Sequence, residues 1–224
     1  MSMLSNLELI RRVPLFALLT SAQAESVADA VVKRRFKRGE AIVEQGHKSN
    51  TLFILLTGRA RVVSADRRGR EVILATLQPG DYVGEMSLID NQAHSATVRA
   101  EVQTDMLTLG RAEFARCLPE NSSMAYAIMK GLVQRLRQAD RKIESLALMD
   151  VYGRVARALL EFAQPDRDGH LTVRERISRQ DIAKMVGASR EMVSRVMKDL
   201  EERGFVETRE DGSMLIKEHL GALN

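Results

Sequence analysis

The spacing of hydrophobic residues changes along the chain, and the first stretch has helical spacing. Between residues 1 and 35 apolar side chains recur every three or four positions. They are Leu4, Leu7, Ile10 and Val13, followed by Ala24, Val27, Ala28 and Val31. This pattern predicts amphipathic helices over residues 1–35, interrupted at Pro14. The basic run that follows, from Lys33 to Arg38, is expected to form a solvated edge.

From Phe36 to Leu109 the pattern becomes one of short apolar runs separated by glycines. The runs expected to be strands are Thr51–Leu56, Arg61–Ser64, Glu71–Leu77 and Ala96–Val102. They are rich in β-branched residues, and glycines at nearly even spacing separate them. Many short strands with regular turns are typical of a small antiparallel barrel or jelly roll.

Helical spacing returns over a long segment, about Ser122 to Met149. Its apolar residues alternate by four and three, at Ala125, Met129, Leu132, Leu136, Ala139, Ile143 and Leu146. A heptad repeat this regular favours a parallel two-stranded coiled coil, and hence a homodimer. The alternative is a helix packed on its own β-domain. Asp150 is expected to cap a further helix over Tyr152–Phe162, and Gln164–His170 reads as a polar turn.

The stretch from Ser178 to Leu200 predicts two short helices joined by a tight turn. Ser178 and Ser189 are suitable N-caps, and Gly187 can adopt the positive φ that ends a helix. In the second helix the residues spaced for burial are Val193, Val196, Met197 and Leu200. Asp211-Gly212 between two strand-like runs then predicts a hairpin, which would make the motif a winged helix-turn-helix.

The opposite face of that second helix has the chemistry of a DNA reader. It presents Arg190, Glu191, Ser194, Arg195 and Lys198. Arginine can donate two hydrogen bonds to guanine, and glutamate can accept one from cytosine. The alternative is an ordinary helical hairpin with a solvated charged face. The two arginines near the start of the helix favour DNA binding.

Composition narrows the class of protein. The 224 residues suit two small domains, and the net charge of +4 with a pI near 9.4 is compatible with an anionic partner. A single cysteine, Cys117, fits a reducing cytoplasm, and no apolar run suggests a membrane segment or membrane partner. The sequence offers neither metal-ligand spacing nor a nucleophile–base constellation, so we expect no metal, no catalytic residues and no enzyme activity.

Several of these segments resemble the Crp/Fnr family of bacterial transcription regulators. They are SREMVSRVMKDLEERGFV in the helix-turn-helix, and RGEAIVEQG, LFILLTGRARV and PGDYVGEMSL in the β-region. The resemblance implies an α+β protein: a cyclic-nucleotide-binding β-roll (1–121), a dimerisation helix (122–149) and a winged helix-turn-helix (150–224).

The resemblance also implies a function. The homodimer would bind a palindromic operator with TGTGA-like half-sites and would contact RNA polymerase. Arg190 and Arg195 would face guanines and Glu191 a cytosine. Three further residues, Arg179, Ser189 and Ser194, would lie close to the DNA.

An effector site is implied by GEMSLIDNQAHSATVRA (residues 84–100), which resembles the family's phosphate-binding cassette. Gly84, Glu85, Ser95 and Ala96 match its pattern. The arginine that grips the phosphate in cyclic-AMP binders is replaced by His94, and the loop is one residue shorter. Both departures put cyclic AMP in doubt.

The long helix departs from the cyclic-AMP pattern as well. The Thr–Ser pair that holds adenine in the cyclic-AMP receptor is replaced by Ala139 and Asp140. Asp140 could accept hydrogen bonds from guanine, and Arg137 could stack on a base or bind a phosphate. We therefore favour cyclic di-GMP over cyclic AMP as the effector. Two alternatives stay open: a constitutive DNA binder with a vestigial pocket, in which Arg137 and Asp140 form only a solvated salt bridge, and a nucleotide-binding module that acts on a protein.

Overall fold

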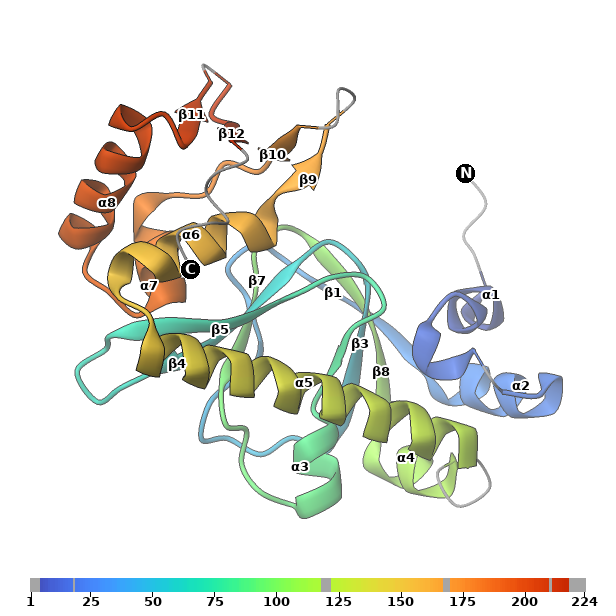
Figure 1. Cartoon of the computed structure of the whole chain (residues 1–224). Helices are drawn as coiled ribbons and strands as arrows, with labels where there is room; N and C mark the ends of the chain where they lie inside the picture. The colour runs from blue at the N-terminus through green and yellow to red at the C-terminus, as the bar shows by residue number, and fades with distance from the viewer. Residues whose placement is uncertain (1–4, 18, 118–121, 167–169, 210, 218–224) are drawn as a thin grey trace. The chain divides into compact units, whose positions relative to one another are not determined.

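The computed structural model describes residues 5–17, 19–117, 122–166, 170–209 and 211–217 (Figure 1). The chain divides into two compact units, Met1–Leu136 and Arg137–Asn224, and the division falls within the long helix α5 (Ser122–Leu148). Among the described residues no helix is both long enough and apolar enough to cross a membrane.

Two antiparallel sheets form the β-roll of the first unit. One has the strand order β1-β8-β3-β6 and the other β2-β7-β4-β5. The strands are β1 (Val32–Phe36), β2 (Ala41–Val43), β3 (Thr51–Thr57), β4 (Ala60–Ala65), β5 (Glu71–Leu77), β6 (Tyr82–Val83), β7 (Thr97–Ala100) and β8 (Thr104–Gly110). Apolar side chains from both sheets form a common core that includes Phe53, Leu55, Val98 and Met106. The predicted β-domain is confirmed.

Helices cover one side of this roll. They are α1 (Asn6–Arg11), the 3₁₀-helix η1 (Pro14–Phe16), α2 (Ser21–Ala30), α3 (Glu85–Asp90), α4 (Arg111–Cys117) and the first part of α5. Their buried residues, among them Ile10, Met124 and Ile128, pack with Ile54 and Leu107 of the sheet in a second apolar cluster. The β-roll therefore positions both α3 and the beginning of α5.

The prediction of helix up to residue 35 is wrong at its end. Val32–Phe36 form strand β1, which pairs with β8, a strand that the sequence did not single out. A non-local ion pair holds this arrangement: Arg35 Nε lies 2.6 Å from Asp105 Oδ1 on β8, and Lys33 Nζ lies 3.7 Å from Oδ2. Apart from Phe36 the strand is exposed, as expected of a solvated edge.

The second unit is a winged helix-turn-helix. Its elements after α5 are α6 (Val151–Phe162), β9 (Gln164–Pro165), β10 (Leu171–Val173), α7 (Arg179–Val186), α8 (Arg190–Glu202), β11 (Val206–Thr208) and β12 (Met214–Ile216). The strands form one sheet in the order β11-β12-β10-β9. Side chains from the helices and the sheet share a core around Leu159, Met197 and Ile216.

Most features of this unit could be predicted from short stretches of its sequence. The Asp150 carboxylate accepts a hydrogen bond from the Gly153 N–H at 2.8 Å and caps α6, as predicted. The polar turn predicted for Gln164–His170 is wrong at its start. Gln164 and Pro165 form β9 and pair with Thr172 and Leu171 of β10. Residues 167–169 of that segment lie outside the described residues.

Candidate DNA-binding and effector-binding sites

Two capped helices hold the predicted DNA-reading motif. The Ser178 hydroxyl accepts from the Asp181 N–H at 3.0 Å and begins α7. Gly187 ends α7 at φ +66°, a left-handed conformation that glycine adopts at little cost. The Ser189 hydroxyl accepts from the Met192 N–H at 3.2 Å and begins α8. The predicted caps and turn are confirmed, and they fix where α8 starts.

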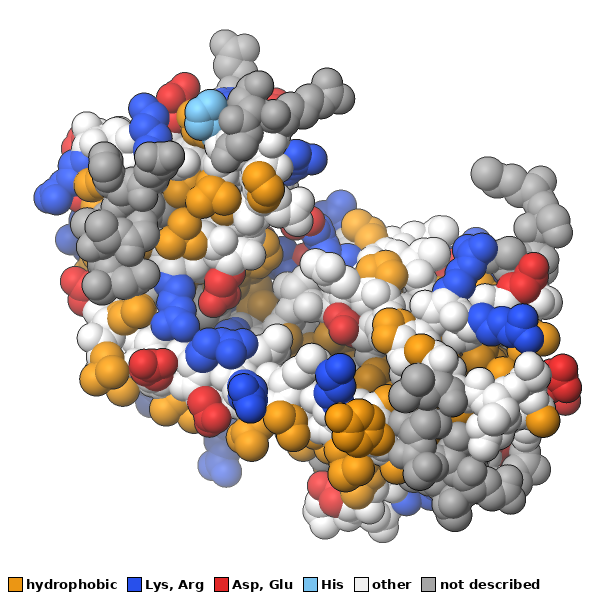
Figure 2. All heavy atoms as spheres, turned by 45° about the vertical axis from the view of Figure 1, so that its right-hand side comes forward, with side chains coloured by type: hydrophobic (Ala, Val, Ile, Leu, Met, Phe, Trp, Pro, Cys, Tyr) orange, Lys and Arg blue, Asp and Glu red, His pale blue; other side chains and the backbone are white. Residues whose placement is uncertain are grey.

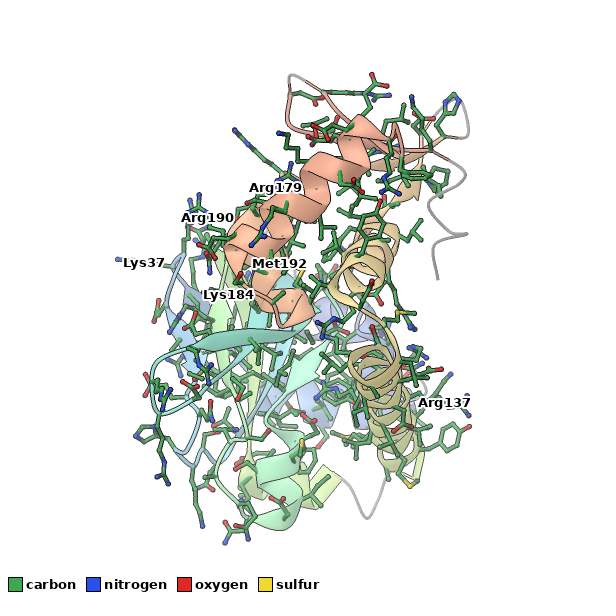
Figure 3. All side chains as sticks on the ribbon, turned by 60° about the vertical axis from the view of Figure 1, so that its left-hand side comes forward. Lys37, Arg137, Arg179, Lys184, Arg190 and Met192 are labelled. Carbon is green, nitrogen blue, oxygen red and sulfur yellow. The ribbon has the colours of Figure 1, made fainter. Side chains whose placement is uncertain are left out.

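Burial fixes which side of α8 faces outward. The predicted apolar face is confirmed, since Val193, Met197 and Leu200 are fully buried and Val196 is nearly so. The predicted DNA-contacting residues of this helix are exposed; they are Arg190, Glu191, Ser194 and Arg195. Arg190 lies at the beginning of α8 and points away from the helix (Figure 3).

The electrostatics of this face suit base recognition. The Glu191 backbone N–H and the Ser189 hydroxyl donate to the Glu191 carboxylate, and with Arg190 and Arg195 nearby they hold its pKa below the ordinary value. Glu191 is therefore an acceptor at neutral pH. The Ser194 hydroxyl donates to the Arg190 carbonyl at 2.9 Å, which leaves it as an acceptor toward DNA.

Met192 belongs to the same surface and was missed in the sequence. It is 38% exposed, and Figure 3 labels it near Arg190 of the same helix. An apolar side chain there can contact a thymine methyl group. A methionine within an amphipathic helix more commonly packs in a core, so its spacing alone did not reveal the exposure.

Arg179 has a structural partner within this unit. Its guanidinium donates to Glu201 Oε1 at 3.0 Å, and the Thr208 hydroxyl donates to the same oxygen at 2.7 Å. These bonds join the start of α7, the end of α8 and strand β11. Arg179 is only partly exposed, unlike Arg190. Contacts within its own unit hold its guanidinium, and its position close to DNA stays a prediction.

The wing is the predicted hairpin. Strands β11 and β12 pair from Val206↔Ile216 to Thr208↔Met214. Asp211 accepts from the backbone N–H and the hydroxyl of Ser213, and Gly212 has φ +84°. Glu210 lies outside the described residues.

In the first unit, the predicted effector cassette begins at a glycine that no other residue can replace. Gly84 has φ +97°, and a Cβ added there would lie 2.4 Å from the Thr51 carbonyl oxygen. The next residue, Glu85, begins α3 and is 1% exposed. Close packing against β3 therefore buries a carboxylate at the start of the cassette.

An ion pair that the sequence did not reveal neutralises this carboxylate. Arg135 Nη1 lies 2.6 Å from Glu85 Oε1, and Arg135 also donates to the Tyr82 carbonyl. Its guanidinium lies 5.2 Å from the centre of the Tyr82 ring. Burial raises the pKa of Glu85, while the charge of Arg135 opposes that rise. The contact spans fifty residues, so no local pattern could identify the partner.

A second missed arginine supports the other end of α3. Arg111 donates to the carbonyls of Ser87 and Leu88 at 2.8 and 3.0 Å, and to the side chains of Asn50 and Asn91. Both carbonyls lie in the last turn of α3; that of Leu88 is one that a helix leaves free at its C-terminal end, whereas that of Ser87 also accepts from the Asn91 N–H at 3.1 Å. The cassette helix is thus held by Arg135 at one end and by Arg111 at the other.

The loop after α3 carries the remaining cassette residues. His94 Nε2 lies 2.8 Å from the Ser49 hydroxyl, and burial lowers the pKa of His94 below its ordinary value. Ser95 is exposed, whereas Ala96 is buried just before β7. The imidazole is therefore mostly uncharged at neutral pH.

Arg137 and Asp140 belong to the second unit. Both are exposed on α5, and Arg137 points away from the helix (Figure 3). Within the described residues no ion pair joins Arg137 to Asp140, so the salt bridge considered as an alternative is not seen. The described part of the chain also shows no group of three or more His, Cys, Asp or Glu residues suited to a metal ion.

Comparison with known proteins identifies both units. Residues 33–121 match the cyclic nucleotide-binding domain, and residues 153–221 match the Crp-like helix-turn-helix domain. A β-roll of the first type joined to a helix-turn-helix of the second defines a ligand-sensing DNA-binding regulator.

Whole-chain relatives specify the family. The cAMP-activated global transcriptional regulator Vfr of Pseudomonas aeruginosa is 38% identical over 79% of this chain and 86% of its own. The cAMP-activated regulator CRP of Salmonella typhimurium is 33% identical over 77% of this chain and 83% of its own. The chain belongs to the Crp/Fnr family and is a transcription regulator, not an enzyme.

Solved structures agree with this assignment. The c-di-GMP responsive global regulator CLP of Xanthomonas campestris superposes with a TM-score of 0.76 at 25% identity, covering 88% of this chain and 99% of its own. The predicted α+β architecture of β-roll, long helix and winged helix-turn-helix is confirmed. The comparisons include relatives named for two different nucleotides, and so leave the effector open.

Proposed function

We propose that this protein acts as a homodimer that binds a palindromic operator and regulates transcription through contacts with RNA polymerase. The observation that carries the proposal is the surface of α8, where Arg190, Glu191 and Arg195 are exposed on a helix with a fully buried opposite face. Donors and an acceptor held rigidly at the start of a helix are suited to the major groove.

Base readout is tested by one substitution on two DNA duplexes. Arg195→Ala is expected to weaken binding to a palindrome of TGTGA half-sites by about 1–3 kcal/mol, and to reduce discrimination at one guanine. Fluorescence anisotropy measures the affinity for two duplexes that differ only at that guanine. The ratio of the two affinities gives the discrimination.

Lys198→Ala is the matched control on the same helix, because Lys198 is exposed and pairs with Glu202 at 3.6 Å. It is expected to weaken binding equally on both duplexes. If Arg195→Ala also leaves the discrimination unchanged, Arg195 does not read a base. Absence of salt-dependent DNA binding by the parent protein would instead favour a module that acts on a protein partner.

Support for the dimer comes from the predicted heptad face of α5. Leu136 is 62% exposed, Ile143 65% and Leu146 57%, although all are large and apolar. Hydrophobic side chains are visible on the surface over this helix in Figure 2. In contrast, Met124 and Ile128 at the start of α5 are buried against the β-roll. A second copy of α5 would cover the exposed face by coiled-coil packing.

The proposed effector is a cyclic nucleotide, with cyclic di-GMP favoured over cyclic AMP. Glu85 of the cassette and Arg135 of α5 supply a paired carboxylate and cation, and His94 takes the place of the phosphate-gripping arginine. Asp140 and Arg137 are both exposed and have the chemistry to recognise guanine and phosphate. Bound near Asp140, the effector would bias the relative angle of two paired α5 helices and hence the spacing of the recognition helices.

A thermal-shift screen of cyclic AMP, cyclic GMP and cyclic di-GMP tests the effector. Cyclic di-GMP is expected to raise the melting temperature most, and Asp140→Asn to reduce that shift, with Glu144→Gln on the same helix as control. Any active nucleotide is then added to an operator titration. Equal operator affinity with and without every nucleotide would establish the alternative, a constitutive DNA binder with a vestigial pocket.

A further inference from the structure

The first unit contains a cavity outside the predicted cassette. Its volume is about 460 Å³, within the range of small-molecule sites. It lies where α1 and η1 meet the end of β3 and the loop before β6. Its lining is Leu9, Arg12, Val13, Pro14, Lys33, Leu55, Leu56, Thr57, Pro79 and Gly80. No lining residue belongs to the cassette, residues 84–100.

The backbone explains why a space remains here. The pairing of β3 with β8 shifts its register between Leu55 and Thr57, so a bulge lies in the cavity wall. Across from it, Gly80 has φ +98°, and a Cβ there would come within 3.1 Å of the Pro14 ring. The backbone of this loop therefore lies close to the Pro14 ring of η1, and the cavity forms beside this contact.

Its lining is divided between an apolar part and a cationic part. Leu9, Val13, Leu55 and Leu56 are buried or half-buried and belong to or border the apolar clusters. Arg12 and Lys33 add two positive charges, and the Thr57 hydroxyl adds a hydrogen-bonding group. Among the described residues, no ion pair within 4 Å involves Arg12.

The neighbouring carboxylates leave these cations available. Asp105 is held by Arg35, through Nε at 2.6 Å and Nη2 at 3.1 Å, while Lys33 stands farther away at 3.7 Å. Glu8, close to Arg12 in sequence, accepts from the backbone and the hydroxyl of Ser5, and the charge of Arg12 acts on it more weakly than these bonds. An ammonium has three donors, so Lys33 can bind a further anion while it stays near Asp105.

We propose that this cavity is a second small-molecule site, and that its ligand is an amphipathic monocarboxylate of the medium-chain fatty acid type. The carboxylate binds Arg12 and Lys33, and the alkyl chain lies against the leucines and Val13. Apolar walls with a few convergent polar groups are typical of such sites. The site is independent of the operator and of the cassette nucleotide.

Isothermal titration calorimetry of the full chain with octanoate tests the proposal, with 1-octanol and acetate as probes that lack one half of the ligand. Octanoate is expected to bind saturably with one site per chain, and both other probes at least about tenfold more weakly. Arg12→Gln combined with Lys33→Gln should weaken octanoate about tenfold, a loss that allows for the exposure of both cations. Arg11→Gln, at the exposed residue next to Arg12 but outside the lining, is the control and should change nothing.

Each alternative outcome overturns the proposal. Equal binding of octanoate and octanol would show apolar partitioning without an anion site. Octanoate binding that survives the double substitution would place the ligand elsewhere. Absence of binding would remove the site altogether. Circular dichroism spectra and melting temperatures that match those of the parent protein establish that the variants are folded.

Discussion

Glu85 shows how one buried charge can connect the β-roll to the long helix. Its carboxylate is removed from water, which is costly unless a partner compensates the charge. Arg135 provides that compensation from α5 and also donates to the Tyr82 carbonyl. Because Arg135 uses Oε1 and a carboxylate has further acceptor positions, a ribose hydroxyl could bind without breaking the ion pair.

Removing Arg135 should produce a pH-dependent loss of stability. In Arg135→Gln the charge that opposes the raised pKa of Glu85 is gone, so this pKa rises further. Between the unfolded and folded pKa values the native state binds more protons than the unfolded state, so stability falls as pH rises through that window. We expect a loss of about 3 kcal/mol at pH 8 and a clearly smaller loss at pH 5, measured by calorimetry.

The double variant Glu85→Gln with Arg135→Gln provides the control. It has no titrating group at this position, so its stability relative to the parent should differ much less between the two pH values. If Arg135→Gln loses the same free energy of unfolding at pH 8 and at pH 5, then Glu85 does not titrate between these pH values. In that case the ion pair with Arg135 is not what keeps the Glu85 carboxylate charged.

His94 makes a separate prediction about effector affinity. Burial lowers the pKa of His94, so the imidazole gains its charge only below the ordinary range. If His94 contacts an effector phosphate, affinity should rise as pH falls between about pH 8 and pH 5. His94→Arg, charged throughout, should bind more tightly, with little pH dependence from this position. Titration calorimetry with the nucleotide found in the screen measures both, and flat, identical curves would exclude the contact.

At the scale of elements, local signals in the sequence were reliable and distant contacts were not. The caps at Ser178 and Ser189, the turn at Gly187 and the heptad helix could all be predicted, because their determinants lie within a few residues. Strand β1 was misread, because its pairing with β8 depends on residues seventy positions away. For the same reason Arg135 and Arg111 were missed, although they hold the cassette helix in place.

The contact between α5 and Tyr82 depends on a glycine. A Cβ at Gly131 would lie 2.1 Å from the Tyr82 hydroxyl oxygen and 3.1 Å from the ring carbon that bears it. Gly131→Ala gains about 1 kcal/mol of helix propensity but must displace a buried side chain. We expect a net destabilisation of about 1–2 kcal/mol, measured as a calorimetric shift of the first unit.

Tyr82→Phe separates these two effects. It removes the hydroxyl and its long 3.4 Å bond to the Ile128 carbonyl, so in that background Gly131→Ala should be nearly neutral. An equal penalty in both backgrounds would mean that the hydroxyl is not the obstacle. The comparison thus tests whether α5 touches the β-roll at this residue.

At the scale of the whole molecule, α5 belongs to both units. Its beginning is buried against the β-roll, and the division between the units falls after Leu136. Beyond that point the apolar residues of the heptad are exposed in the single chain. The heptad repeat could be predicted from the sequence. A single chain, however, does not supply the second α5 helix that would bury its apolar residues.

The proposed dimer predicts that one charge on this face should separate the subunits and weaken operator binding. Ile143→Lys places an ammonium at a seam position that is already exposed in the single chain, so the fold should be retained. Sedimentation velocity is expected to show monomers at concentrations where the parent protein is dimeric. Affinity for the palindrome should fall at least a hundredfold, because joining two half-site contacts is worth about 10²–10⁴.

Gln138→Lys adds the same charge to the same helix, at an exposed residue outside the heptad seam. It should remain dimeric and bind the palindrome like the parent protein, apart from a small gain from the added charge. Because the two variants have the same net charge, a difference between them cannot come from net charge and reports on the loss of the apolar seam residue. If Ile143→Lys stays dimeric with full operator affinity, the exposed face of α5 does not join the subunits, and another surface must pair the recognition helices.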